Sequence, residues 1–123
     1  YRLYDWDRVD AKGIGRELHN DLAVDAINYE ETNTKVTYNS ERNESVNLVD
    51  CPFFTTNILE VSGTYNWKKK KESFTVFMCT EGSFVLVTSN SKSEFKKGDT
   101  VLIPAILEEF QFIGETSLLE ITI

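Results

Sequence analysis

The sequence predicts a mainly β protein, a jelly-roll barrel or sandwich with one short α-helix near its N-terminus. From Lys35 onward, short runs of β-branched and aromatic residues alternate with turn signals, which is typical of all-β folds. Before that point, only residues 16–28 place apolar side chains at helical spacing. A chain of 123 residues has room for one hydrophobic core.

The first element expected is a half-buried strand over residues 1–8, because apolar and charged side chains alternate in YRLYDWDR. Residues 10–15 carry two glycines in a polar context and predict a turn. The amphipathic helix over residues 16–28 follows, and the polar residues 29–34 end it. We expect this helix to pack as a bracket against a sheet.

About eight strands are expected in the remainder of the chain. The candidates are residues 36–39, 46–50, 57–63, 74–80, 84–88, 100–103, 109–112 and 118–123. Pro52 and Pro104 lie at the edges of such runs, where a missing amide donor does least harm. The runs FTVFMC and VLIP are apolar at consecutive positions, which predicts two sheets packed face to face. The four lysines at residues 68–71 predict a solvated hairpin tip.

The charge balance excludes several classes of partner. Thirteen basic and twenty acidic residues leave a net charge of -7, which disfavours binding to nucleic acid or to an anionic membrane. No apolar run is long enough to span a bilayer, and no basic stretch leads into an apolar one as a signal peptide would. Together with only two cysteines, this predicts a soluble, cytoplasmic protein. The chain starts at Tyr1 without an initiator methionine, so we expect a piece of something longer.

The single histidine limits the chemistry that the chain can carry. A zinc site needs three or four suitable ligands, and His19 has no partner at ligand spacing. A hydrogen-bonding role on the helix surface is the better interpretation. Cys51 and Cys79 lie in apolar runs and are expected to act as small hydrophobic residues rather than as nucleophiles.

The segment KKGDTVLIPAILEEF, residues 96–110, resembles the second motif of cupins, which are small double-stranded β-helix barrels. It departs from that motif at Ile106, where a glycine is usual, and at Glu109, which follows Glu108 and stands in the place of a metal-binding histidine. The region of the first motif, SFTVFMCTEGSFVLV, contains no histidine. The resemblance therefore implies a barrel packed with apolar side chains instead of a metal. The alternative is a carboxylate metal site made by Glu81, Glu108 and Glu109.

The N-terminal segment YRLYDWDRVDAKGIGRELHNDLAVDAINYE resembles type I mannose-6-phosphate isomerases of the bacterial kind, in which a similar strand and turn lead into an RELH helix. The later stretches CPFFTTNILEV, MCTEG and KGDTVLIPA resemble the C-terminal half of that family in the same order. The resemblance covers nearly the whole chain.

The resemblance implies an enzyme that interconverts mannose 6-phosphate and fructose 6-phosphate through an enediol, with a zinc ion bound in an N-terminal cupin domain. Residues 1–33 would then be a strand and helix that link to this upstream catalytic cupin domain. Residues 34–123 would be a metal-free C-terminal cupin, structural in role and inactive alone. The zinc ligands would all precede Tyr1, so no cofactor is expected in this chain. The sugar-phosphate substrate would be met only through the parent protein.

One catalytic residue is implied by the resemblance. Arg2 occupies the place of a family arginine that faces the substrate, where a guanidinium can hold phosphate or stabilise enediolate charge. The alternative is that Arg2 is one of several charges on an edge strand. Other residues that match the family pattern are assigned to packing between the domains; these are Tyr4, Trp6, Arg8, Arg16 and His19.

Two further functions stay open on the sequence alone. One is a free-standing, metal-free cupin that binds a small sugar or sugar phosphate without catalysis, its pocket lined by Trp67, Phe84 and Phe110. The other is an interaction domain whose adhesive edge is the strand over residues 1–8.

Overall fold

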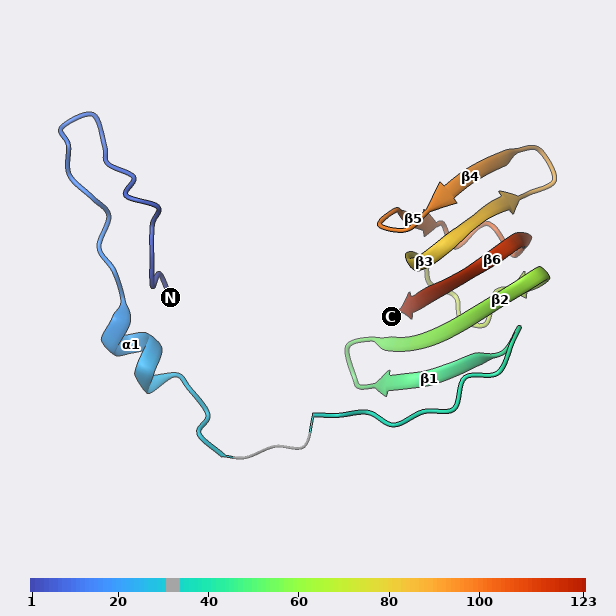
Figure 1. Cartoon of the computed structure of the whole chain (residues 1–123), viewed down its shortest axis with the longest axis horizontal. Helices are drawn as coiled ribbons and strands as arrows, with labels where there is room; N and C mark the ends of the chain where they lie inside the picture. Colours follow the sequence, from blue (N-terminus) through green and yellow to red (C-terminus); the bar gives the residue numbers. More distant parts are fainter. Residues whose placement is uncertain (31–33) are drawn as a thin grey trace. The chain divides into compact units, whose positions relative to one another are not determined.

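The computed structural model describes residues 1–30 and 34–123 (Figure 1). The chain divides into two compact units, Tyr1–Lys35 and Val36–Ile123. The predicted boundary between residues 33 and 34 adjoins residues 31–33, which lie outside the described part of the chain.

The larger unit is an antiparallel β structure. Its strands are β1 (Ser45–Asp50), β2 (Thr55–Lys68), β3 (Thr75–Val87), β4 (Lys92–Lys96), β5 (Thr100–Ile103) and β6 (Glu109–Thr122). They form one sheet in the order β1-β2-β6-β3-β4, and β5 pairs with the first residues of β3. Together with one short helix in the smaller unit, this confirms the predicted mainly β class.

The strands are fewer and longer than predicted. The predicted strands over residues 74–80 and 84–88 are parts of the single strand β3, which has an irregularity between Cys79 and Glu81. The predicted strands over residues 109–112 and 118–123 are likewise parts of β6, which ends at Thr122. The predicted strand at residues 36–39 is absent from the described residues, and β4 was not predicted. The strands continue because their glycines bend the chain without interrupting the hydrogen-bonded ladder.

Three glycines on neighbouring strands lie close to one another across the sheet. Gly63 in β2 is opposite Gly114 in β6, and Gly82 in β3 is opposite Thr116. All three have positive φ values. A Cβ on Gly82 would lie 2.1 Å from the carbonyl oxygen of Glu115, and one on Gly114 would lie 2.5 Å from that of Ser83. Only glycine permits this approach of β3 to β6.

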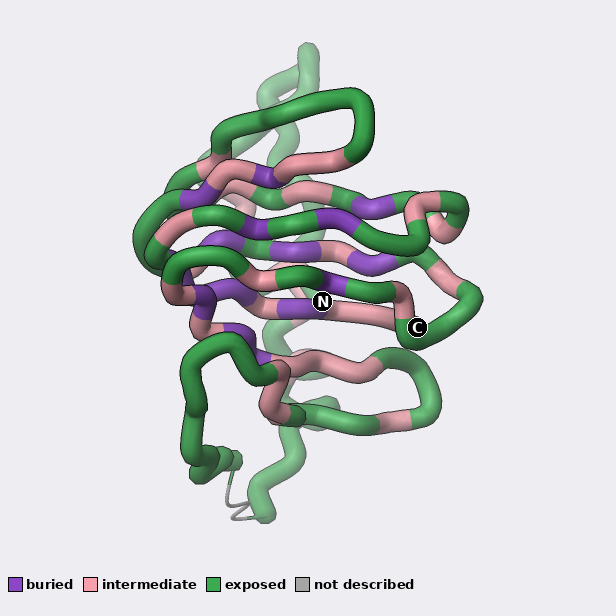
Figure 2. Tube along the Cα trace, turned by 90° about the vertical axis from the view of Figure 1, so that its right-hand side faces the viewer, coloured by how far each residue is buried: buried purple, intermediate pink, exposed green. Residues whose placement is uncertain are grey.

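The core lies on one face of the curved sheet. Figure 2 shows the strands stacked side by side, with buried and exposed positions alternating along them. Five buried aromatic rings interlock edge to face or stacked, with ring centroids 4.8–6.0 Å apart. These rings belong to Trp67, Phe77, Phe84, Phe110 and Phe112.

The opposite face of the sheet is partly exposed, so the prediction that both faces are covered is wrong. Met78 is 40% exposed and Leu102 is 57% exposed, so consecutive apolar residues did not mean that both faces are covered. The strands belong to a single connected sheet rather than to two separate sheets. The lysine run also departs from a fully solvated tip, because Lys69 is largely buried and donates a hydrogen bond to the carbonyl of Ala105.

The smaller unit contains no strand among its described residues, so the predicted strand over residues 1–8 is wrong. The chain instead makes a tight turn at Trp6 and Asp7, both with φ of 53°, closed by the Arg8 amide donating to the Asp5 carbonyl. The predicted turn over residues 10–15 is present, since the Asp10 side chain accepts two backbone hydrogen bonds there.

The helix α1 spans only Asn20–Asp25, shorter than the predicted residues 16–28. The residues before it are engaged elsewhere: Arg16 pairs with Asp5, and the amide of His19 donates to the carbonyl of Arg2. An amide that bonds to a distant carbonyl cannot also close the first helical turn. The long-range pairing therefore delays the start of the helix.

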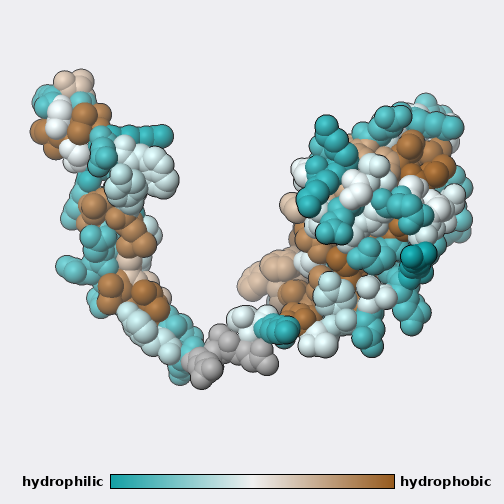
Figure 3. All heavy atoms as spheres, viewed as in Figure 1, coloured by the Kyte–Doolittle hydropathy of each residue, from teal (hydrophilic) through white to brown (hydrophobic). Residues whose placement is uncertain are grey.

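The smaller unit has an unusual distribution of exposure. Its half-buried described residues are Arg2, Asp5, His19 and Ala23. Large apolar and aromatic side chains lie on its surface instead, and the aliphatic ones form the brown patches along this part of the chain in Figure 3. The exposed side chains are Tyr1, Leu3, Tyr4, Trp6, Val9, Ile14, Leu18, Leu22, Val24, Ile27 and Tyr29.

Candidate functional site

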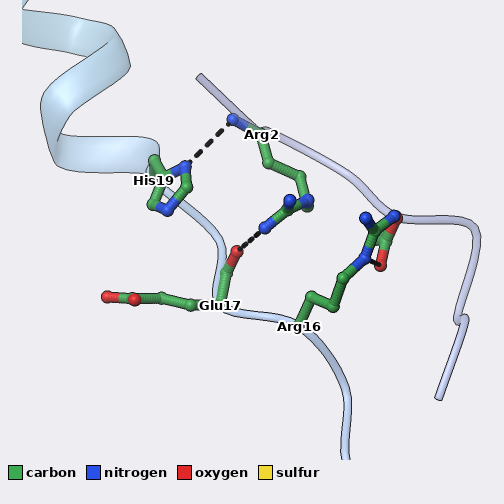
Figure 4. Close-up of polar contacts among 5 residues, drawn as sticks. Arg2, Arg16, Glu17 and His19 are labelled. Atoms are coloured by element: carbon green, nitrogen blue, oxygen red, sulfur yellow. Dashed lines mark hydrogen bonds and ion pairs between the residues drawn. The ribbon is translucent and has the colours of Figure 1, made fainter. Parts of the chain in front are cut away.

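The candidate site surrounds Arg2 in the smaller unit (Figure 4). The Arg2 amide donates to Nδ1 of His19 at 3.3 Å, and the Arg2 carbonyl accepts the His19 amide hydrogen at 2.8 Å. The Arg2 guanidinium donates to the carbonyl oxygen of Glu17 at 2.8 Å. Both the backbone and the side chain of Arg2 are therefore tied to residues 17–19.

A second arginine secures the same segment. Arg16 makes a two-point ion pair with Asp5, with Nε donating to Oδ2 at 2.8 Å and the terminal nitrogen contacting Oδ1. This hydrogen-bonded pairing lowers the pKa of Asp5 below its ordinary value, against the effect of desolvation, and the charges of Arg2 and Arg8 add to it. Asp5 is thus paired with Arg16 and is influenced by the charges of Arg2 and Arg8.

A shallow pocket opens at this cluster. Its lining consists of Arg2, Tyr4, Asp5, Trp6, Arg8 and Arg16. Three positive charges face one negative charge, so the pocket favours an anion such as a phosphate or a carboxylate. The rings of Tyr4 and Trp6, 5.2 Å apart, add an apolar wall. Guanidinium groups remain charged at neutral pH. These arginines can therefore bind and stabilise negative charge, but they do not release a proton as a general acid would.

The sequence predicts His19 within a helix over residues 16–28. In the structure His19 is the N-cap residue of α1, directly before Asn20. The predicted hydrogen-bonding role is present, because the ring accepts from the Arg2 amide. The ring makes no capping hydrogen bond to the helix. The sequence does not reveal Asp5 and Glu17 as part of this site, because the spacing of Asp5 and Arg16 carries no local signal and Glu17 contributes only its backbone carbonyl.

The alternative carboxylate metal site is wrong. Glu81 is opposite Ser117 in the sheet, whereas Glu109 is opposite Lys68, eight residues away along β6. Within residues 1–30 and 34–123, no three His, Cys, Asp or Glu side chains are gathered as a metal site requires. The described residues therefore do not fit a zinc ion.

The aromatic residues considered for a sugar pocket lie in the core. Trp67, Phe84 and Phe110 are each at most 4% exposed. Trp67 and Phe110 border one surface pocket and Phe84 borders another, so they offer a ligand little surface. The same interior contains a buried carboxylate, Glu120, which the sequence analysis does not predict. Strand alternation could have indicated its burial, because Glu120 lies two residues after the buried Leu118 and on the same face of the strand.

No helix among the described residues has the length and apolar character needed to cross a membrane.

Comparison with known proteins identifies relatives for both units. The family model described as "Mannose-6-phosphate isomerase, cupin domain" matches residues 44–123. Mannose-6-phosphate isomerase ManA of Bacillus subtilis is 33% identical over 117 residues, which are 93% of this chain and 37% of that protein. The mannose-6-phosphate isomerase of Streptococcus mutans is 26% identical over 97% of this chain and 38% of its own length.

Solved structures agree with these matches. The crystal structure of the mannose 6-phosphate isomerase from Bacillus subtilis superposes with a TM-score of 0.70 and 28% identity, covering 100% of this chain and 40% of that one. A cupin-2 domain protein from Shewanella frigidimarina superposes on 68% of this chain at 13% identity and a TM-score of 0.58, a likeness of fold alone. The cupin-like architecture is thereby confirmed.

Proposed function

The chain belongs to the mannose-6-phosphate isomerase cupin-domain family, and from that premise we propose that it is the C-terminal part of an enzyme interconverting mannose 6-phosphate and fructose 6-phosphate. In this proposal the larger unit is a structural barrel without its own catalytic centre. The reaction takes place with an upstream catalytic domain, in the cytoplasm, and this chain by itself is inactive.

The greater length of the related proteins supports this division into an upstream catalytic domain and a structural barrel. The chain spans 37% of ManA and 40% of the superposed crystal chain. The described residues supply no ligand set for the zinc that the family resemblance implies. We therefore assign zinc binding to residues outside this chain, and assign no chemical step to the barrel.

The surface of the smaller unit supports a domain partner. Its polar residues Arg2, Asp5 and His19 are half-buried, whereas its large apolar side chains are exposed. Such a surface gains free energy when another protein surface covers it. We assign that covering surface to the upstream catalytic domain.

The observation that carries a catalytic role is the pocket of three arginines. Arg2 is held by hydrogen bonds on its backbone and side chain, with Arg8 and Arg16 in the same lining. In the proposed enzyme, the Arg2 guanidinium binds the substrate phosphate or stabilises the negative charge of the enediolate.

The test is a coupled mannose-6-phosphate isomerase assay with added zinc, run on the complete reading frame that contains this chain and on this chain alone. Activity is expected only in the longer protein. Arg2→Ala should lower kcat/KM there by about a hundredfold, the scale seen when a charge-stabilising donor is removed. Arg42→Ala, a change of the same type in the larger unit, serves as the control and should leave the rate unchanged. Absence of activity in the longer protein would overturn the proposal.

A further inference from the structure

We propose that His19 is a positioning residue that holds Arg2 in its working orientation through a neutral ring accepting at Nδ1. The inference rests on the proposed role of Arg2 and adds a residue on which that role depends. Arg2 and His19 are joined at two points, amide to ring nitrogen at 3.3 Å and amide to carbonyl at 2.8 Å. An acceptor at Nδ1 requires that the ring carry its proton on Nε2.

The position of His19 in the helix argues that its ring is used for Arg2. N-cap positions favour Ser, Thr, Asp and Asn, whose side chains bond the free amides of the first turn. His19 occupies the N-cap of α1 without making such a bond. The ring instead accepts a hydrogen bond from the Arg2 amide. The ring of Tyr1 lies edge-on to the imidazole, with centroids 6.2 Å apart, and further restricts it.

The same segment fixes the Arg2 side chain. One guanidinium nitrogen donates to the Glu17 carbonyl, which leaves the other donors available for an anion in the pocket. Arg16, next to Glu17, is anchored to Asp5. His19 therefore fixes the backbone of Arg2, while Glu17 fixes its guanidinium. Losing the His19 acceptor removes one of the two bonds that hold the Arg2 backbone, and it loosens the group that the substrate meets.

Two substitutions distinguish the loss of the hydrogen-bond acceptor at Nδ1 from the loss of the imidazole ring itself. The amide oxygen of Asn reaches the place of Nδ1, whereas that of Gln reaches the place of Nε2. His19→Asn should preserve the bond from the Arg2 amide, and His19→Gln should abolish it. In the complete reading frame, His19→Gln should lower kcat/KM about tenfold or more, because small displacements of catalytic groups cost rate steeply. His19→Asn should stay within about threefold of the parent.

A double-mutant cycle shows whether His19 acts through Arg2. In the Arg2→Ala background, His19→Gln should cause no further loss of kcat/KM. Full additivity, or equal losses in His19→Asn and His19→Gln, would overturn the positioning role and leave the proposed function intact. If Arg2→Ala retains the parent kcat/KM, the catalytic role of Arg2 fails first, and the positioning role fails with it.

Nuclear magnetic resonance of the complete reading frame tests the contact without an activity readout. The ring-nitrogen shifts of His19 should report a neutral ring protonated on Nε2, and the Arg2 amide shift should move in His19→Gln but stay near its place in His19→Asn. A ring protonated on Nδ1 would overturn the inference whatever the kinetics show.

Discussion

Glu120 is a buried carboxylate whose surroundings keep it ionised. Its side chain is 1% exposed, and its oxygens accept hydrogen bonds from Ser45, Asn57 and Trp67, with Lys70 3.9 Å away. Burial alone raises the pKa of Glu120, but the three hydrogen bonds and the lysine charge together outweigh it, so the pKa lies below its ordinary value of 4.5. The carboxylate links β1, β2 and β6 from inside the core.

The lowered pKa makes stability depend on pH. A carboxylate with a depressed folded-state pKa contributes stability above its unfolded-state pKa, and that contribution is lost as the pH falls through the folded-state value. Glu120→Gln removes the charge and leaves buried donors poorly paired, so it should cost about 1–3 kcal/mol at pH 7. Urea unfolding at several pH values measures this. The difference between parent and variant should shrink below pH 4.5; a constant difference would contradict the role of the charge.

Among the secondary-structure elements, the long strands β2 and β3 each contain a glycine with a positive φ value. Gly82 and Gly63 have nearly the same φ, 75° and 74°, but differ in their surroundings. A side chain on Gly82 meets the backbone of β6, whereas one on Gly63 meets nothing within 4 Å. The pair therefore separates the cost of backbone conformation from the cost of strand approach.

Alanine at these two positions should have different effects. Gly63→Ala should cost about 1–2 kcal/mol, the penalty of a left-handed conformation for a residue with a Cβ. Gly82→Ala carries a similar penalty and must also push β3 away from β6, which adds about 1–3 kcal/mol. Thermal and urea unfolding of both variants provide the measurement. Equal losses would mean that the close approach of β3 and β6 does not constrain the fold.

At the scale of the whole molecule, the two units bury different kinds of side chain. The larger unit encloses a core of interlocking aromatic and aliphatic residues. The smaller unit is held by polar contacts around Arg2, Asp5 and His19 and exposes its apolar residues. Local stability follows buried apolar contacts, so the units should differ in resistance to opening.

Hydrogen exchange distinguishes the units directly. In this chain alone, amides of β2, β3 and β6 should exchange slowly, whereas those of Asn20–Asp25 should exchange almost as fast as in an unfolded peptide. In the complete reading frame, the amides of this helix should become protected because the catalytic domain covers the apolar surface. Strong protection of the helix in the chain alone would show that the smaller unit needs no partner.

Part of the candidate site was accessible from sequence, and part was not. Arg2 was identified by resemblance, and a hydrogen-bonding His19 was expected because a lone histidine lacks metal partners. The pairing of Asp5 with Arg16 joins residues eleven positions apart through a turn, and the use of the Glu17 carbonyl involves no side chain. Neither contact has a periodic pattern that could reveal it.

Alternation and turn residues act locally along the chain, so they predict the β class and the positions of several strands. The family follows from the resemblance of motifs such as YRLYDWDR and KGDTVLIPA. Contacts between distant residues set where the strands continue and where the helix begins. Gly82 and Gly114 continue their strands because neighbouring backbones need the space of a missing side chain. The helix begins at Asn20 because the His19 amide is already bonded to Arg2. Each outcome depends on a partner distant in sequence, which local propensity does not encode.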